Sequence, residues 1–200
     1  MSEIPAALVK SLRDATGAGM MECKAALKEA NGDIEEAKLI LRKRGLAQAG
    51  KKSGRTTKEG LIGSYIHMGG KIGVLLELNC ESDFVARTDD FQNLLRELSL
   101  QVAAANPQYV SREEIPADVL DRERSVYRAQ MENSGKPPAV IEKIIEGKLG
   151  SFYEQVCLVD QPSIRDPKAT VTTLLQAAIA KLGENIGVAR FVRFKVGEGA

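Results

Sequence analysis

The chain has 200 residues, of which 44% are hydrophobic and 28% are charged, and this composition is typical of a soluble globular protein that buries a core without disulfides. Its 28 basic and 27 acidic side chains give a net charge of +1, which argues against a surface built as a whole for nucleic acid. The single histidine excludes a histidine-rich metal site within one chain, and three widely spaced cysteines without a CxxC motif are typical of reduced cytosolic thiols.

The sequence contains neither a familiar catalytic signature nor an export signal. GxSxG, HExxH, Walker-type and GxGxxG motifs do not occur, so no residue pattern indicates an enzyme. No apolar run approaches the ~20 residues of a membrane helix, and residues 1–5 lack the basic and apolar regions that begin a signal peptide. We therefore expect a cytoplasmic protein that does not bind membranes.

Residues 1–45 predict a bundle of three short helices. Apolar residues recur every three or four positions in the first helix, which is expected to stop at the glycine-rich turn 17–19. The second helix is expected to end at the Asn-Gly pair 31–32. Asp33 then begins a D-x-x-E variant of the capping box for a third helix, which Gly45 is expected to end.

Residues 46–59 are expected to form a basic linker between two domains. The stretch 42–58 contains seven Lys or Arg side chains and no acidic one, and its glycines loosen the chain. This composition favours a flexible, solvated tether. The alternative is a basic contact surface for RNA or for an acidic protein.

Residues 60–200 predict a second domain of the α+β class. The segments 61–67 and 72–78 have strand-like composition and flank a Gly-Gly turn, which predicts a β-hairpin. A further strand is expected at 186–196. We expect it to join the hairpin in an antiparallel three-stranded sheet packed with helices.

The helices of this second domain follow from their apolar periodicity. An amphipathic helix is expected around 91–102, and a last helix at 174–182. Two further helices are joined by the short turn 133–137, whose length forces antiparallel packing. We therefore expect a helical hairpin over about 116–156.

Two segments pose the question of whether their apolar residues lie in the core or on a binding surface. Asp83 either caps a turn while Phe84 packs into the core, or the pair projects into a pocket of a partner. Met20 and Met21 either fill the small helical core or form an adaptable apolar patch. The residues alone leave both questions open.

The other reactive side chains favour structural roles. His67 lies near a turn without a second histidine, so it is more often a polar residue at a strand end than a base or a metal ligand. Cys23, Cys80 and Cys157 have apolar neighbours and are expected to be small core residues rather than nucleophiles.

Several motifs, taken in order, resemble those of one protein family. The segment 12–27 (LRDATGAGMMECKAAL) is similar to the N-terminal signature of bacterial elongation factor Ts, and 78–86 (LNCESDFVA) is similar to its second signature. The segments 134–137 (SGKP), 183–186 (GENI) and 190–194 (RFVRF) also match in order. The resemblance covers essentially the whole chain, and it is to the short form of the family, with one core repeat where longer members have two.

The resemblance implies a guanine-nucleotide exchange factor for the translational GTPase elongation factor Tu. Such a factor is not an enzyme, because it makes and breaks no covalent bond. The resemblance also implies that the three-helix bundle has a ubiquitin-associated-like fold and docks on the GTPase domain. The positions that match this contact are Arg13, Met20, Met21 and Lys24.

The same resemblance assigns roles to three further residues. Asp83 and Phe84 match the pair that intrudes beside the magnesium and phosphates of the bound nucleotide. His67 matches a histidine that touches the third domain of the GTPase. The Mg²⁺ ion, GDP and GTP belong to the partner, so we expect no cofactor in this chain.

The short form further implies a homodimer, and thus a 2:2 complex with elongation factor Tu, formed by the sheet or its neighbouring helices. Direct binding of nucleic acid is not expected. The alternative function is an RNA- or ribosome-associated binding module that uses the basic segment 42–58, for which affinity would depend steeply on salt.

Overall fold

The computed structural model describes residues 4–132 and 134–198. Within these residues the chain forms eight α-helices and one antiparallel sheet with the strand order β1-β2-β3, which confirms the α+β class. None of the described helices is both long and apolar enough to cross a membrane.

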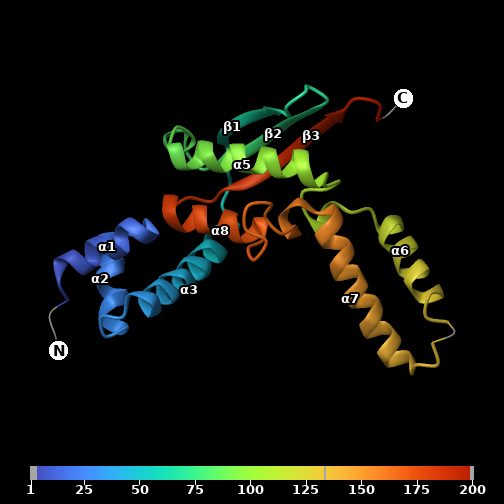
Figure 1. Ribbon diagram of the computed structural model, residues 1–200, viewed down its shortest axis with the longest axis horizontal. Coiled ribbons are helices and arrows are strands. Elements are labelled where there is room, and N and C mark those ends of the chain that lie inside the picture. Colours follow the sequence, from blue (N-terminus) through green and yellow to red (C-terminus); the bar gives the residue numbers. More distant parts are fainter. Residues whose placement is uncertain (1–3, 133, 199–200) are drawn as a thin grey trace. The chain divides into compact units, whose positions relative to one another are not determined.

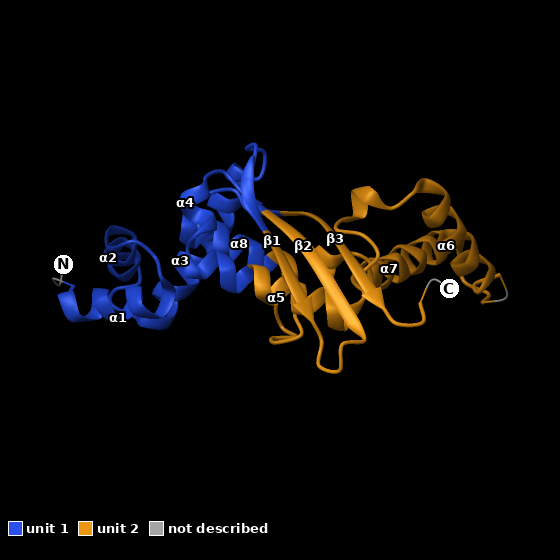
Figure 2. Cartoon of the chain, turned by 90° about the horizontal axis from the view of Figure 1, so that it is seen from above, with its two compact units in different colours: residues 1–61, 79–94, 173–187 blue, residues 62–78, 95–172, 188–200 orange. Residues whose placement is uncertain are grey.

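The chain packs into two compact units, which Figure 2 shows in different colours. Unit 1 comprises residues 1–61, 79–94 and 173–187, and unit 2 comprises residues 62–78, 95–172 and 188–200. Each unit is therefore assembled from three separate chain segments. The domain boundaries expected after residues 45 and 59 stay a prediction.

The three expected N-terminal helices are present in unit 1 (Figure 1). They are α1 (Ala6–Thr16), α2 (Met20–Glu29) and α3 (Ile34–Lys52). Gly17 ends α1 in the left-handed conformation (φ 69°), and its N–H donates to the carbonyl of Arg13 at 2.7 Å. The buried core of the bundle consists of Val9, Leu12, Cys23, Ala26, Leu27, Ala30 and Ala37.

The expectation that Gly45 ends the third helix is wrong, because α3 continues to Lys52. A Cβ on Gly45 would lie 2.9 Å from the Cβ of Ala180 in α8 (Val171–Leu182). Glycine at this position therefore permits two helices of unit 1 to approach closely. Ala49 is also buried, so the first part of the expected flexible linker is an ordered helix.

The sheet consists of β1 (Glu59–Ile66), β2 (Ile72–Cys80) and β3 (Gly187–Lys195). The backbone N–H of His67 donates to the carbonyl of Ile72 at 2.9 Å and closes the expected hairpin. The third strand pairs with β2, and it thus joins the hairpin in a three-stranded sheet, as the sequence predicts.

One face of the sheet is covered by α5 (Asp89–Ala105), as Figure 1 shows. A Cβ on Gly63 would lie 2.6 Å from the Cγ of Leu95, so this helix packs directly on the strand. Side chains on β2 alternate between buried and more exposed positions, which is the pattern of a sheet with one covered face. The fully buried positions of this strand include Val74, Leu76, Leu78 and Cys80.

The expected helical hairpin belongs to unit 2 and consists of α6 (Ala117–Ala129) and α7 (Pro138–Val156). The two helices lie side by side in Figure 1, and an ion pair of 2.9 Å between Arg128 and Glu142 connects them. Asn133, the first residue of the expected turn, lies outside the described residues.

Two short 3-10 turns, η1 (Arg112–Glu114) and η2 (Leu158–Asp160), lie at the base of this hairpin. The Nε of Arg112 donates to Asp160 at 3.0 Å, and the guanidinium lies 4.5 Å from the centre of the Tyr153 ring. These contacts tie the start and the end of the hairpin together.

Candidate partner-binding site

Phe84 lies on the four-residue helix α4 (Asp83–Ala86), which two residues connect to the end of β2. Its side chain is 79% exposed, whereas Ala86 at the end of the same helix is buried. The alternative in which Phe84 packs into the core is therefore wrong. The carboxylate of Asp83, the residue before Phe84, forms an ion pair of 2.8 Å with Arg87. A charged pair therefore flanks the exposed ring in the sequence.

A carboxylate from a distant part of the chain holds the segment before this helix. Glu184 accepts hydrogen bonds from the backbone N–H of Ser82 at 2.9 Å and from the Ser82 hydroxyl at 2.6 Å. It also accepts from the N–H of Glu81 at 3.1 Å. The carboxylate of Glu81 in turn accepts from the N–H of Asn185 at 2.6 Å.

Cys80 contacts the same segment from the end of β2. Its buried thiol donates to the carbonyl of Ser82 at 3.1 Å. Burial raises the pKa of the Cys80 thiol, and the negative charge of Glu184 raises it further. The thiol is therefore kept protonated at neutral pH, in agreement with a structural role.

The predicted docking residues lie on the outside of the N-terminal bundle. Met20 is 48% exposed and Met21 is 77% exposed, so the alternative in which they fill the helical core is wrong. Arg13 and Lys24 are also exposed. Cys23, Ala26 and Leu27 of the same helix are buried, so α2 has one side in the core of the bundle and the rest of its surface available for contact.

His67 is exposed at the turn of the β-hairpin and belongs to unit 2, whereas the other predicted site residues belong to unit 1. Its Nδ1 lies 3.0 Å from the hydroxyl of Tyr65, within hydrogen-bond distance. The two rings are tilted at 46° with centroids 6.1 Å apart. This arrangement orients the imidazole at the protein surface.

The described residues contain no group of three or more His, Cys, Asp or Glu side chains arranged to hold a metal ion. The three cysteines are free thiols and all are buried. Burial raises the pKa of Cys157 to about 11, which makes it a poor nucleophile at neutral pH.

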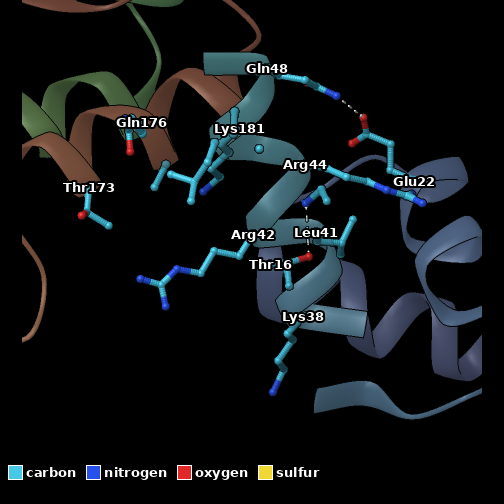
Figure 3. Close-up of a pocket in the computed structure, with 15 residues that line it drawn as sticks. Thr16, Glu22, Lys38, Leu41, Arg42, Arg44, Gln48, Thr173, Gln176 and Lys181 are labelled. Carbon is cyan, nitrogen blue, oxygen red and sulfur yellow. Dashed lines mark hydrogen bonds between the residues drawn. The ribbon is translucent and has the colours of Figure 1, made fainter. Parts of the chain in front are cut away.

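A pocket of about 300 Å³ lies within unit 1 beside α3 and α8 (Figure 3). Its apolar lining includes Leu41, Leu46 and Ala180, and Glu22 and Gln48 form a hydrogen bond of 3.4 Å at its edge. None of the predicted site residues lines it. Sequence reasoning missed this pocket because its walls come from segments about 130 residues apart.

Part of the basic segment 42–58 is engaged within unit 1. Arg44 pairs with Glu29, and the Nζ of Lys52 donates to the carbonyl of Gly183 at 2.7 Å. Arg55 pairs with Glu81 at 3.5 Å. These contacts argue against a segment reserved as a whole for RNA. The other basic side chains of the segment are exposed: Arg42, Lys43, Lys51 and Lys58.

Comparison with known proteins shows which family this chain belongs to. The family model described as Elongation factor TS matches residues 6–198. The chain belongs to the elongation factor Ts family. This membership implies a nucleotide exchange factor of translation elongation, and so a factor that exchanges a bound nucleotide rather than a catalyst of covalent chemistry.

Relatives in this family match along nearly the whole chain. The elongation factor Ts of Fervidobacterium nodosum is 61% identical over 196 residues, which are 98% of this chain and 100% of the relative. That of Thermosipho melanesiensis is 58% identical over 195 residues, with the same coverage of both chains. The Solibacter usitatus protein is 55% identical over 198 residues, which are 99% of this chain and 93% of the relative.

Proposed function

We propose that this chain binds the GDP form of elongation factor Tu and promotes the release of GDP. The proposal rests on the exposure of Phe84, an aromatic side chain that is 79% exposed on a short helix. A large apolar ring left in water is costly for a protein alone and is typical of an anchor that a partner buries. Membership in the elongation factor Ts family supports elongation factor Tu as that partner.

The proposed mechanism follows from thermodynamic linkage. If the factor binds the nucleotide-free GTPase more tightly than the GDP form, it must weaken GDP binding by the same ratio. Asp83 and Phe84 act as a wedge beside the magnesium and phosphate site of the partner, and GTP binding then displaces the factor. The Mg²⁺ ion and the nucleotides belong to the GTPase, and the chain acts in the cytoplasm.

The N-terminal bundle provides the docking surface in this proposal. Met20 and Met21 offer exposed, flexible apolar side chains, which adapt to a partner helix. Arg13 and Lys24 lie exposed near them in sequence and add positive charge, which favours an acidic partner surface. His67 contributes a separate contact with the third domain of the GTPase.

We also propose that the factor acts as a homodimer in a 2:2 complex. The sheet face that α5 does not cover carries apolar side chains, and an exposed patch of this kind favours association. A Cβ on Gly73 would lie 3.1 Å from Ile66, which puts these positions on that same face. The exposed side chains are Ile62 (67%), Ile66 (67%), Leu75 (47%), Val192 (41%) and Phe194 (66%).

Size-exclusion chromatography with light scattering tests the partner and the stoichiometry together. The full chain is run alone, with nucleotide-free elongation factor Tu, and with that complex after addition of GTP. We expect a stable complex with the mass of two copies of each protein, which GTP dissociates. No complex with the nucleotide-free GTPase would contradict the proposed function, and a 1:1 mass would contradict the dimer alone.

A further inference from the structure

The turn between α8 and β3 supports the segment that carries Phe84. Glu184 in this turn accepts three hydrogen bonds, one from the N–H of Glu81 and two from Ser82, although these residues are more than 100 positions apart in the sequence. A carboxylate that accepts from N–H and O–H groups forms charge-assisted bonds, which are stronger and shorter than neutral ones. The contact between Glu184 and the Ser82 hydroxyl is short, at 2.6 Å.

Phe84 itself has little packing to fix its position. Its ring is 79% exposed, and α4 has only four residues, so the helix does not stabilise itself. The ion pair of Asp83 with Arg87 is local and exposed. The direction of the ring therefore depends on the backbone of α4, which the buried Ala86 fixes at its end and the segment 81–82, held by Glu184, fixes at its start.

The same turn also contacts the end of α3. The side-chain amide of Asn185 donates to the carbonyl of Arg55 at 2.8 Å and to that of Ser53 at 3.3 Å. Lys52 donates to the carbonyl of Gly183 at 2.7 Å. All these residues belong to unit 1, so the turn is itself anchored and does not move freely with the segment it supports.

We infer that Glu184 is a positioning residue for the wedge: by fixing the backbone of Glu81 and Ser82 it pre-organises Phe84 for entry into the partner. The inference rests on the proposed exchange function. Pre-organisation lowers the entropy lost when the ring enters its pocket, so its loss acts on the step in which GDP is released. Docking through the N-terminal bundle does not require it.

A double-mutant cycle tests this role. Release of fluorescent GDP from elongation factor Tu is followed at increasing concentrations of wild type, Glu184→Ala, Phe84→Ala and the double variant. We expect Glu184→Ala to lower the maximal release rate about tenfold, with the half-saturating concentration changed less than about threefold. In the Phe84→Ala background the same substitution has no further effect, because Glu184 acts through the ring.

Further variants separate positioning from a loss of structure. Glu146→Ala removes an exposed carboxylate on α7 and keeps the wild-type rate. Glu184→Gln and Ser82→Ala remove fewer interactions than Glu184→Ala and have smaller effects, so they keep the test informative if Glu184→Ala does not fold. Thermal melts of each variant accompany the rates.

The outcomes that overturn the inference differ from those that overturn the function. An unchanged maximal rate for Glu184→Ala, or equal losses in the wild-type and Phe84→Ala backgrounds, would overturn the positioning role and leave the exchange function standing. A wild-type chain that does not accelerate GDP release would overturn the proposed function, and the inference with it.

Discussion

Gly45 and Ala180 approach so closely that a Cβ on Gly45 would lie 2.9 Å from the Cβ of Ala180. Real Cβ atoms essentially never come this near to each other, so two helices of unit 1 meet at a point that only glycine accommodates. The glycine has an ordinary helical position within α3, and its role is close packing rather than helix termination.

The substitution Gly45→Ala therefore destabilises the protein, although alanine is the better helix former. Helix propensity alone would stabilise α3 by up to about 1 kcal/mol. Overpacking against Ala180 outweighs this and lowers the free energy of unfolding by about 1–3 kcal/mol. Urea denaturation followed by circular dichroism measures the change.

The same helix offers a matched control for that measurement. A Cβ on Gly50 would meet no other atom within 4 Å. Gly50→Ala therefore adds only the better helix propensity of alanine and stabilises the protein. If both substitutions stabilised the chain equally, the close approach of α3 and α8 would be wrong.

Truncating a side chain of the docking surface and truncating the wedge are expected to have different effects on the kinetics of GDP release. Met21 is 77% exposed on the bundle and contributes to binding in the proposed complex. Met21→Ala raises the half-saturating concentration of the factor about tenfold, at the scale of a typical anchor side chain, and leaves the maximal rate unchanged. Titrated GDP-release kinetics measure both quantities. Val126→Ala, an exposed position on α6, serves as the control, and a lower maximal rate for Met21→Ala would contradict a pure docking role.

A charge on the uncovered sheet face is expected to dissociate the proposed homodimer. Phe194 is 66% exposed on this face, and Phe194→Glu places a carboxylate where a dimer interface buries apolar surface. Light scattering then gives the mass of one chain instead of two. Val140→Glu introduces the same charge on α7 and leaves the mass unchanged. A Phe194→Glu variant that keeps the dimer mass would place the interface elsewhere.

Cys157 makes the stability depend on pH in the alkaline range. Burial raises its pKa from 9.0 to about 11, so the folded protein keeps the thiol proton to a higher pH than the unfolded chain. The stabilisation is fully present below pH ~9 and is lost as the pH rises to ~11, by up to about 3 kcal/mol. Urea unfolding at pH 8.5 and 10.5 compares wild type with Cys157→Ala, which removes this dependence. A stability difference that stays constant between the two pH values would contradict it.

The sequence predicted the elements well where local patterns decide them. Apolar periodicity identified the three N-terminal helices and the helical hairpin, and the Gly-Gly turn identified the β-hairpin. The prediction that Gly45 ends a helix was wrong, because a glycine that ends a helix and a glycine that permits close packing look the same in a single sequence. The contact with Ala180 that distinguishes them joins residues far apart in the chain.

The candidate site was predictable only in part for the same reason. Phe84 stood out as an aromatic residue after a strand, but its exposure depends on the surrounding fold, which no local pattern predicts. Glu184 belongs to the segment 183–186 that matches the family, but no local pattern indicated its contacts with Glu81 and Ser82, and none indicated the pocket beside α3. The residues that Glu184 contacts lie about 100 positions away from it, and the two segments that line the pocket are even further apart. A short-range sequence pattern cannot predict contacts over such separations.

Stopped-flow release of fluorescent GDP from elongation factor Tu tests whether Phe84 drives the release of the nucleotide. At saturating concentration we expect the wild-type factor and Val140→Ala, an exposed apolar truncation on α7, to accelerate release equally. Phe84→Ala is expected to lose at least about tenfold of this rate, while its thermal stability stays close to that of wild type because the ring is exposed. If Phe84→Ala accelerated the release of GDP from elongation factor Tu as much as wild type does, Phe84 would not be the wedge.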